Sequence, residues 1–119
     1  MKPELENKIF QDFPELFVDH EGHIYCRDGW YNLIYETLKR IYELNKSVTI
    51  LQIKEKFGAL RIYARTDKDE NNNWENIIDI IDLSEIKSKK ICELCGKEGS
   101  LTNYHGWLKT IVFVILSCR

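Results

Sequence analysis

The chain has 119 residues, 44% of them hydrophobic and 30% charged, which is the composition of a folded domain with one core and excludes a disordered chain. Its 17 basic and 19 acidic residues give a formal net charge of −2, which argues against a general nucleic-acid coat but allows a local basic patch. No apolar run approaches the roughly 20 residues of a membrane helix, and the polar start MKPE is not a signal peptide. We therefore expect a cytoplasmic protein whose four cysteines are reduced.

Two amphipathic helices are predicted in the first 44 residues. The first is short and is expected to end near Pro14, with segment 16–18 anchoring on the core. The second runs from about Gly29 to Leu44, with Asp28 as its predicted N-cap. Its apolar stripe, which we interpret as core, consists of Trp30, Leu33, Ile34, Leu38, Ile41 and Tyr42.

The stretch from Val48 to Arg65 predicts two short strands that fold back on each other at residues 56–58. Successive side chains of a strand point to opposite faces, so the alternation defines two sides. The side expected to face the core carries Leu51, Ile53, Leu60 and Ile62. The opposite side is cationic and partly aromatic, and carries Gln52, Lys54, Arg61, Tyr63 and Arg65.

A third helix is predicted from Trp74 to about Lys89, after a polar loop over residues 66–73. Its acidic side chains are interpreted as a solvated face rather than as catalytic carboxylates. Its buried face is expected to consist of Trp74, Ile77, Ile78, Ile81 and Ile86, widened by Ile80 and Leu83.

The motif that carries chemistry is Cys92-Glu93-Leu94-Cys95-Gly96. Two thiolates two residues apart, followed by a glycine that lets backbone amides turn toward the sulfurs, are typical of a zinc knuckle. A thioredoxin-type redox motif needs a strand before the CxxC and a helix after it, and here a helix precedes, so redox is the weaker interpretation. Cys26 has no base beside it in the sequence and is interpreted as a buried side chain.

A structural zinc ion needs four ligands, and the sequence does not identify the second pair. The downstream candidates are His105 and Cys118, which do not have knuckle spacing, while Tyr104, Trp107 and Leu108 could wrap the site. The alternatives left open are an incomplete site, a site completed from elsewhere, and no site.

Together these patterns predict the α+β class: three helices packed on a β-hairpin, with a C-terminal zinc-knuckle-like segment. A single domain over residues 1–119 is expected, with helices and hairpin in 1–90 and the knuckle with an apolar tail in 91–119.

The chain resembles a family of small, largely uncharacterised bacterial and phage proteins. The marks are Asp28-Gly29-Trp30, the block QIKEKFGALRIY over residues 52–63, CxxCG at Cys92, and GWLKT at residues 106–110. The resemblance implies a phage or mobile-element origin, and thus the cytoplasm of a bacterial host. It also implies a second ligand pair after Thr110, where this chain has Val112 and Ile115.

Two functions remain open at this level. The first is a non-catalytic zinc-binding module that contacts nucleic acid through the basic hairpin face of Lys54, Lys56, Arg61, Tyr63 and Arg65. The second is a protein-binding inhibitor of a host complex, for example in defence. An enzyme is the least favoured class, since the sequence holds no P-loop, no dinucleotide glycine pattern and no HExxH.

Overall fold

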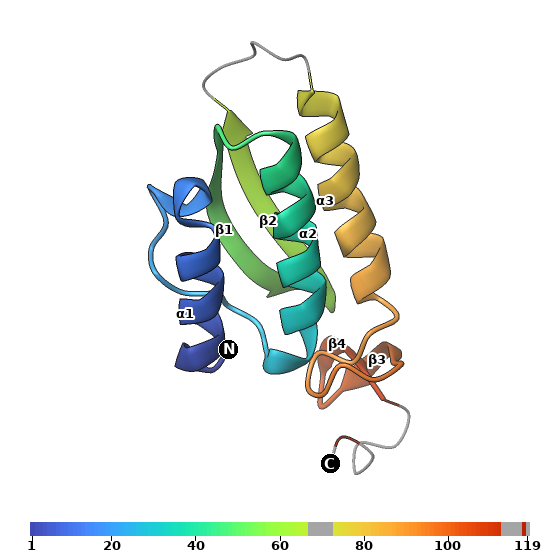
Figure 1. The fold of residues 1–119 in the computed structure, drawn as a ribbon. Coiled ribbons are helices and arrows are strands. Elements are labelled where there is room, and N and C mark those ends of the chain that lie inside the picture. Colours follow the sequence, from blue (N-terminus) through green and yellow to red (C-terminus); the bar gives the residue numbers. More distant parts are fainter. Residues whose placement is uncertain (67–72, 113–117, 119) are drawn as a thin grey trace.

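A computed structural model describes residues 1–66, 73–112 and 118 of the chain, and these form an α+β fold, as predicted (Figure 1). The described helices are α1 (Pro3–Asp12), α2 (Tyr31–Leu44) and α3 (Trp74–Ser88), with short 3-10 turns at Pro14–Phe17 and Asp28–Trp30. Two antiparallel hairpins complete the fold. They consist of β1 (Val48–Lys56) with β2 (Ala59–Thr66), and of β3 (Ser100–Tyr104) with β4 (Trp107–Ile111).

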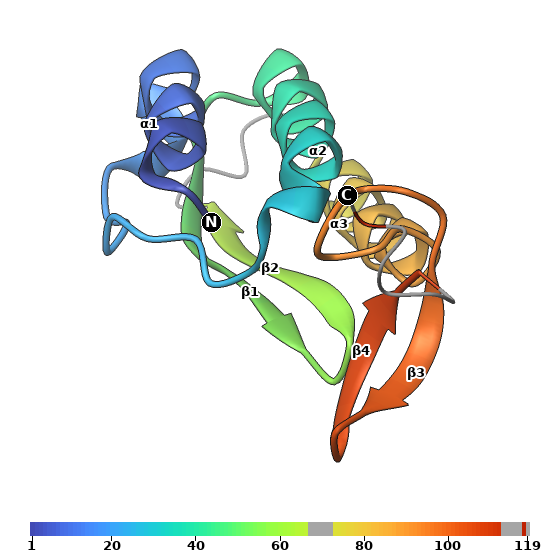
Figure 2. The ribbon, with the colours of Figure 1, turned by 90° about the horizontal axis from the view of Figure 1, so that it is seen from below.

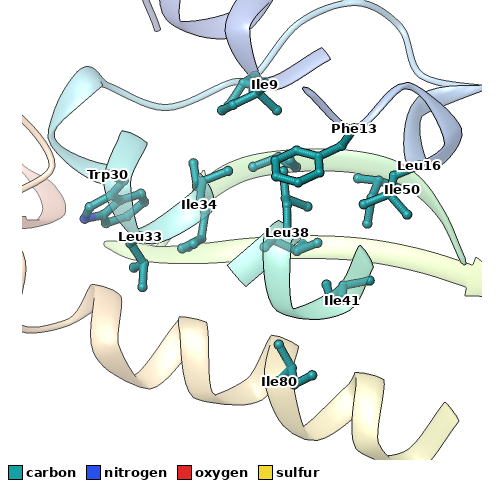
Figure 3. Packing of buried hydrophobic residues seen from close by; sticks show 14 of the residues in the cluster. Ile9, Phe13, Leu16, Trp30, Leu33, Ile34, Leu38, Ile41, Ile50 and Ile80 are labelled. Carbon is teal, nitrogen blue, oxygen red and sulfur yellow. The ribbon is translucent and has the colours of Figure 1, made fainter. Parts of the chain in front are cut away.

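The main core draws apolar side chains from α1, α2, α3 and the first hairpin into one cluster (Figure 3). Trp30 lies at one end of the cluster, on the left in Figure 3, and is fully buried; its indole Nε1 donates a hydrogen bond of 2.8 Å to the carbonyl of Ile91. An indole N–H inside a core needs such a partner, because leaving it unpaired would cost the desolvation energy of the group. The core is thereby tied to the start of the cysteine knuckle.

The first hairpin turns at Phe57 and Gly58, as the sequence predicted, but its register differs from simple alternation. Ile53 pairs with Ile62 and both are buried, which agrees with the prediction. A β-bulge between Ile50 and Gln52 then changes which side chains of β1 point toward the core. As a result Ile50 is buried and Leu51 is only half-buried. The prediction that Leu51 faces the core is therefore wrong.

The predicted N-cap of the second helix is also corrected. Residues Asp28–Trp30 form a 3-10 turn ahead of α2, and the Asp28 side chain does not cap it. Instead, its carboxylate accepts a hydrogen bond of 2.8 Å from the backbone N–H of Lys2, at the start of α1. Asp28 thus joins the first two helices rather than starting the second.

Helix α3 buries a narrower face than the sequence predicted. Its buried residues are Ile77, Ile80, Ser84 and Ser88. Ile78, Leu83 and Ile86 face outward with exposed fractions of 37%, 36% and 55%, so assigning them to the buried face is wrong. The small Ser88 allows a close approach to β2, where its hydroxyl accepts a hydrogen bond of 2.9 Å from the N–H of Leu60.

The second hairpin, β3–β4, was not predicted as strands. It lies at the foot of α2 and α3 and projects away from the main body (Figures 1 and 2). Figure 2 also shows the turn of the first hairpin beside β4. Among the residues described, no helix has the length and apolar character needed to cross a membrane.

Candidate functional site

The structure brings three of the four predicted metal ligands together. The Sγ atoms of Cys92, Cys95 and Cys118 all lie within 4.8 Å of one another, with Cys92 fully buried and the other two partly so. The Sγ atoms of Cys92 and Cys118 are 3.5 Å apart, and the cysteines are free thiols. Zinc–sulfur bonds of about 2.3 Å in a tetrahedron place two sulfurs about 3.8 Å apart, so this spacing suits a thiolate-bound metal.

The surroundings of Cys92 favour its thiolate. Burial raises the pKa of this thiol, but hydrogen bonds from the backbone at Cys95, Val112 and Leu94 lower it more, so the net pKa lies below its ordinary value. The pKa of Cys118 is raised by burial and by its neighbours Cys95 and Cys92. Three thiols this close cannot all ionise without a cation between them, and a divalent metal would supply that charge.

The knuckle is built on backbone geometry that two glycines permit. Gly96 has a φ of +82°, in the left-handed region, and its N–H donates to the carbonyl of Cys92 at 2.9 Å. Gly29 contacts the same CxxC loop, because the N–H of Gly29 donates a hydrogen bond of 2.7 Å to the carbonyl of Glu93. A Cβ at Gly29 would lie 2.2 Å from the Cys92 oxygen, so only glycine allows the knuckle to dock here.

The fourth predicted ligand, His105, is not part of this group. It lies in the turn between β3 and β4, with a φ of +51°, and is exposed. Trp107 and Leu108 follow it on β4, and they do not wrap the cysteines, because their exposed fractions are 73% and 46%. Within the described residues the thiol group has three members, and Ile115 lies outside that part of the chain.

Cys26 is not one of the three clustered thiols, and its interpretation as a buried side chain is confirmed. It is buried, and burial raises the pKa of its thiol to about 12, with the carboxylate of Glu93 adding to the effect. A neutral, enclosed thiol is a poor nucleophile. Cys26 is therefore a packing residue rather than a reactive one.

A buried carboxylate that the sequence did not single out holds the knuckle and both hairpins together. Glu93 is 2% exposed; its Oε2 accepts a hydrogen bond of 3.1 Å from the N–H of Arg27, and its Oε1 lies 3.5 Å from Nζ of Lys109. Lys109 also contacts Glu55 of β1 at 2.9 Å. Partial burial lowers the pKa of Lys109, but Glu55 and Glu93 raise it more, so the ammonium stays charged. In the sequence, the only indication that Glu93 has a structural role was its position between Cys92 and Cys95.

The predicted basic face is largely paired within the protein. Arg61 contacts Glu85 of α3 at 2.8 Å, and Arg65 contacts Asp19 at 2.5 Å. Lys54 lies over the ring of Tyr63, with Nζ 5.4 Å from its centroid. Lys54 and Lys56 form no ion pair with any other described residue. The available positive charge of this face is therefore concentrated at the end of β1, where Lys56 is exposed.

Comparison with known proteins adds no assignment. No protein-family model matches the chain, and no curated protein or solved structure shows significant similarity to it. The function is therefore inferred from two features of the molecule itself, the three-thiol group and the lysine-bearing end of the first hairpin.

Proposed function

We propose that this protein is a small, non-catalytic binding module in which one zinc ion, held by Cys92, Cys95 and Cys118, fixes the C-terminal hairpin. The observation that carries the proposal is the approach of the three thiol sulfurs to within 4.8 Å. An all-sulfur donor set suits zinc, and because structural zinc is four-coordinate, a fourth ligand would complete the tetrahedron around the three thiolates. The resemblance to small bacterial and phage proteins is the ground for proposing an accessory role in a phage or mobile element.

The metal part of the proposal is tested by measuring zinc in the purified protein. We expect about one zinc per chain, and Cys92→Ser and Cys95→Ser should each lower both the zinc content and the melting temperature. Cys26→Ala serves as the matched control, since that buried cysteine should leave the zinc content unchanged. A metal-free wild-type protein whose thermal unfolding ignores a chelator would refute the proposal.

We infer that the partner is nucleic acid, contacted through the outer side of the first hairpin. Lys54 and Lys56 supply positive charge, and the exposed ring of Tyr63 beside Lys54 supplies a stacking surface. The helices would back the apolar side of this hairpin and leave the other side for the partner. The ion pairs of Arg61 and Arg65 hold the surface in shape rather than adding free charge.

The nucleic-acid part is tested by the salt dependence of binding. Replacing Lys54 and Lys56 together by Ala should weaken binding and reduce the slope of log K against log salt by about one to two, since each lysine would release roughly one counterion. Replacing Lys39 and Arg40 together by Ala, which removes the same two charges from exposed positions of α2, is the control and should change neither quantity. Binding that ignores salt would contradict this assignment.

A second candidate is a protein-binding inhibitor of a host complex. It is favoured by the apolar side chains on the second hairpin, where Leu101 and Leu108 are close to half exposed. A defined host partner, captured equally well at low and high salt and lost when both leucines are replaced by serine, would select this function over the first.

A further inference from the structure

We propose that a cleft between the tips of the two hairpins binds single-stranded nucleic acid by stacking bases on Phe57 and Trp107. This inference rests on the proposed function and specifies its ligand. The cleft has a volume of about 520 Å³ and is lined by Glu55, Lys56, Phe57, Gly106, Trp107 and Leu108. Phe57 and Trp107 are 67% and 73% exposed, so both rings are available to a ligand.

The walls of the cleft are fixed against each other. The hydroxyl of Thr110 on β4 donates a hydrogen bond of 2.7 Å to the carbonyl of Gly58, at the tip of the first hairpin. One residue earlier on β4, Lys109 contacts Glu55 at 2.9 Å. A Cβ at Gly58 would lie 2.4 Å from the side chain of Leu101, which shows how closely the two hairpins approach. The backbones that carry the two rings are therefore held relative to each other before any ligand arrives, which lowers the entropic cost of binding.

The backbone at Phe57 gives an independent reason to assign a role to its ring. Phe57 has a φ of +54° and Gly58 a φ of +82°, which is the geometry of a two-residue hairpin turn that Asn-Gly suits best. A bulky residue in the left-handed region costs free energy, and here the ring recovers little of it through burial. An exposed aromatic ring at a strained position favours a contact made outside the chain.

The charge around the cleft suits a polyanion. Both carboxylate oxygens of Glu55 are already occupied, one by the N–H of Gly58 at 2.7 Å and the other by Lys109 at 2.9 Å. Lys56 lies 5.7 Å above the ring of Phe57, as Lys54 lies above Tyr63. The outer side of this hairpin end therefore carries two pairs of a lysine and an aromatic ring.

A single strand of nucleic acid matches this arrangement. Its phosphates and unstacked bases alternate along the strand, and bases stack on aromatic side chains with little preference for sequence. A duplex keeps its bases stacked on each other and cannot offer their faces to Phe57 and Trp107. An acidic peptide would satisfy the lysines but would not use two flat rings in the same way.

The test is a fluorescence-anisotropy titration of the zinc-loaded full chain with labelled oligo-dT and oligo-U of about twelve nucleotides, and with a duplex of equal length. We expect the single strands to bind more tightly than the duplex and to quench tryptophan fluorescence. Trp107→Ala should abolish most of that quenching and weaken binding roughly tenfold or more. Phe57→Asn should weaken binding similarly while preserving the turn, because asparagine tolerates a positive φ.

Ile86→Ala, which removes an exposed apolar side chain on α3, is the matched control and should bind as the wild type does. If the wild type binds single strands in a salt-dependent way but both ring variants bind equally well, the cleft proposal is wrong and the proposed function stands. If the wild type binds no nucleic acid, both the cleft proposal and the nucleic-acid part of the proposed function are wrong. Quenching of Trp107 by an acidic, leucine-containing peptide and not by oligonucleotides would assign the cleft to a protein partner and overturn the proposal.

Discussion

Replacing Gly29 by alanine tests whether the knuckle is docked on the 3-10 turn ahead of α2 as the contacts indicate. By helix propensity alone the change should be favourable, since alanine is better than glycine by up to about 1 kcal/mol. The added Cβ, however, would lie 2.2 Å from the Cys92 oxygen and 2.5 Å from the Glu93 oxygen, both of them backbone atoms. The knuckle must therefore move away, and the sign of the effect reverses.

The size of the loss follows from the contacts that the movement breaks. These are the hydrogen bond of 2.7 Å from Gly29 N–H to Glu93 and the bond of 2.8 Å from the Trp30 indole to Ile91. Each leaves a polar group unpaired at about 1–3 kcal/mol, so the expected loss is about 2–6 kcal/mol. For 119 residues, an unfolding entropy near 2.1 cal/mol/K per residue converts 1 kcal/mol to about 4 °C, which gives a fall in melting temperature of about 8–24 °C.

The assay is thermal unfolding of the zinc-loaded protein followed by circular dichroism, with zinc content measured in parallel. Gly22→Ala is the control: its φ is +91° and no atom lies within 4 Å of the new Cβ, so it should show only the backbone cost of about 1–2 kcal/mol. A Gly29→Ala protein that is as stable as the wild type, or more so, would refute the docking geometry.

Three further predictions concern the core. Ser88→Ala should lower the free energy of unfolding, measured by chemical denaturation, by about 1–3 kcal/mol, because the buried N–H of Leu60 loses its hydrogen-bond acceptor. An unchanged free energy of unfolding would show that this hydrogen bond does not stabilise the protein. Ile80→Asp should destabilise the protein by about 3 kcal/mol or more, and Ile86→Asp by less than about 0.5 kcal/mol. Equal losses of stability would contradict the structure, in which α3 buries Ile80 and exposes Ile86. Cys26, with its pKa raised to about 12, stays a neutral thiol at neutral pH and should resist iodoacetamide until the protein unfolds, as mass spectrometry of the labelled sites would show.

The first hairpin could be predicted because its apolar and polar residues alternate over most of its length. What the alternation could not reveal is the bulge. In the segment VTILQI, Ile50 and Leu51 are both apolar, so the pattern does not decide which of them faces the core. The choice depends on the pairing of Ile50 with Ala64, a contact between distant parts of the sequence.

For helix α3, too, the sequence predicted the element but not which of its side chains are buried. Its existence was predictable, but isoleucines lie on most of its sides, so more than one apolar stripe fits the sequence. The choice of face is made by Ser88, whose small side chain lets the helix approach β2 and whose hydroxyl satisfies Leu60. A buried polar residue was the deciding feature, and a search for hydrophobic periodicity does not register it.

The second hairpin was missed because β3 is exposed along its whole length and β4 along its first half, so neither strand shows a buried alternation. The available signal was the His105-Gly106 pair, both residues of which have positive φ in a tight turn. For the candidate metal site, the CxxC motif indicated two of the three cysteines that the structure brings together. The sequence named both His105 and Cys118 as candidates without choosing between them, and the structure places Cys118 beside the other two cysteines.

Strand β4 connects the two candidate sites. At its end, Ile111 packs with Cys92, and the backbone of Val112 hydrogen-bonds to the Cys92 sulfur. Just before them, Thr110 and Lys109 hold the tip of the first hairpin, and at its start Trp107 and Leu108 line the cleft. A metal bound by the three thiols would therefore fix one wall of the cleft without touching the ligand. If the proposed zinc ion is bound there, it would act on binding by positioning β4, and its removal would be expected to alter the cleft as well.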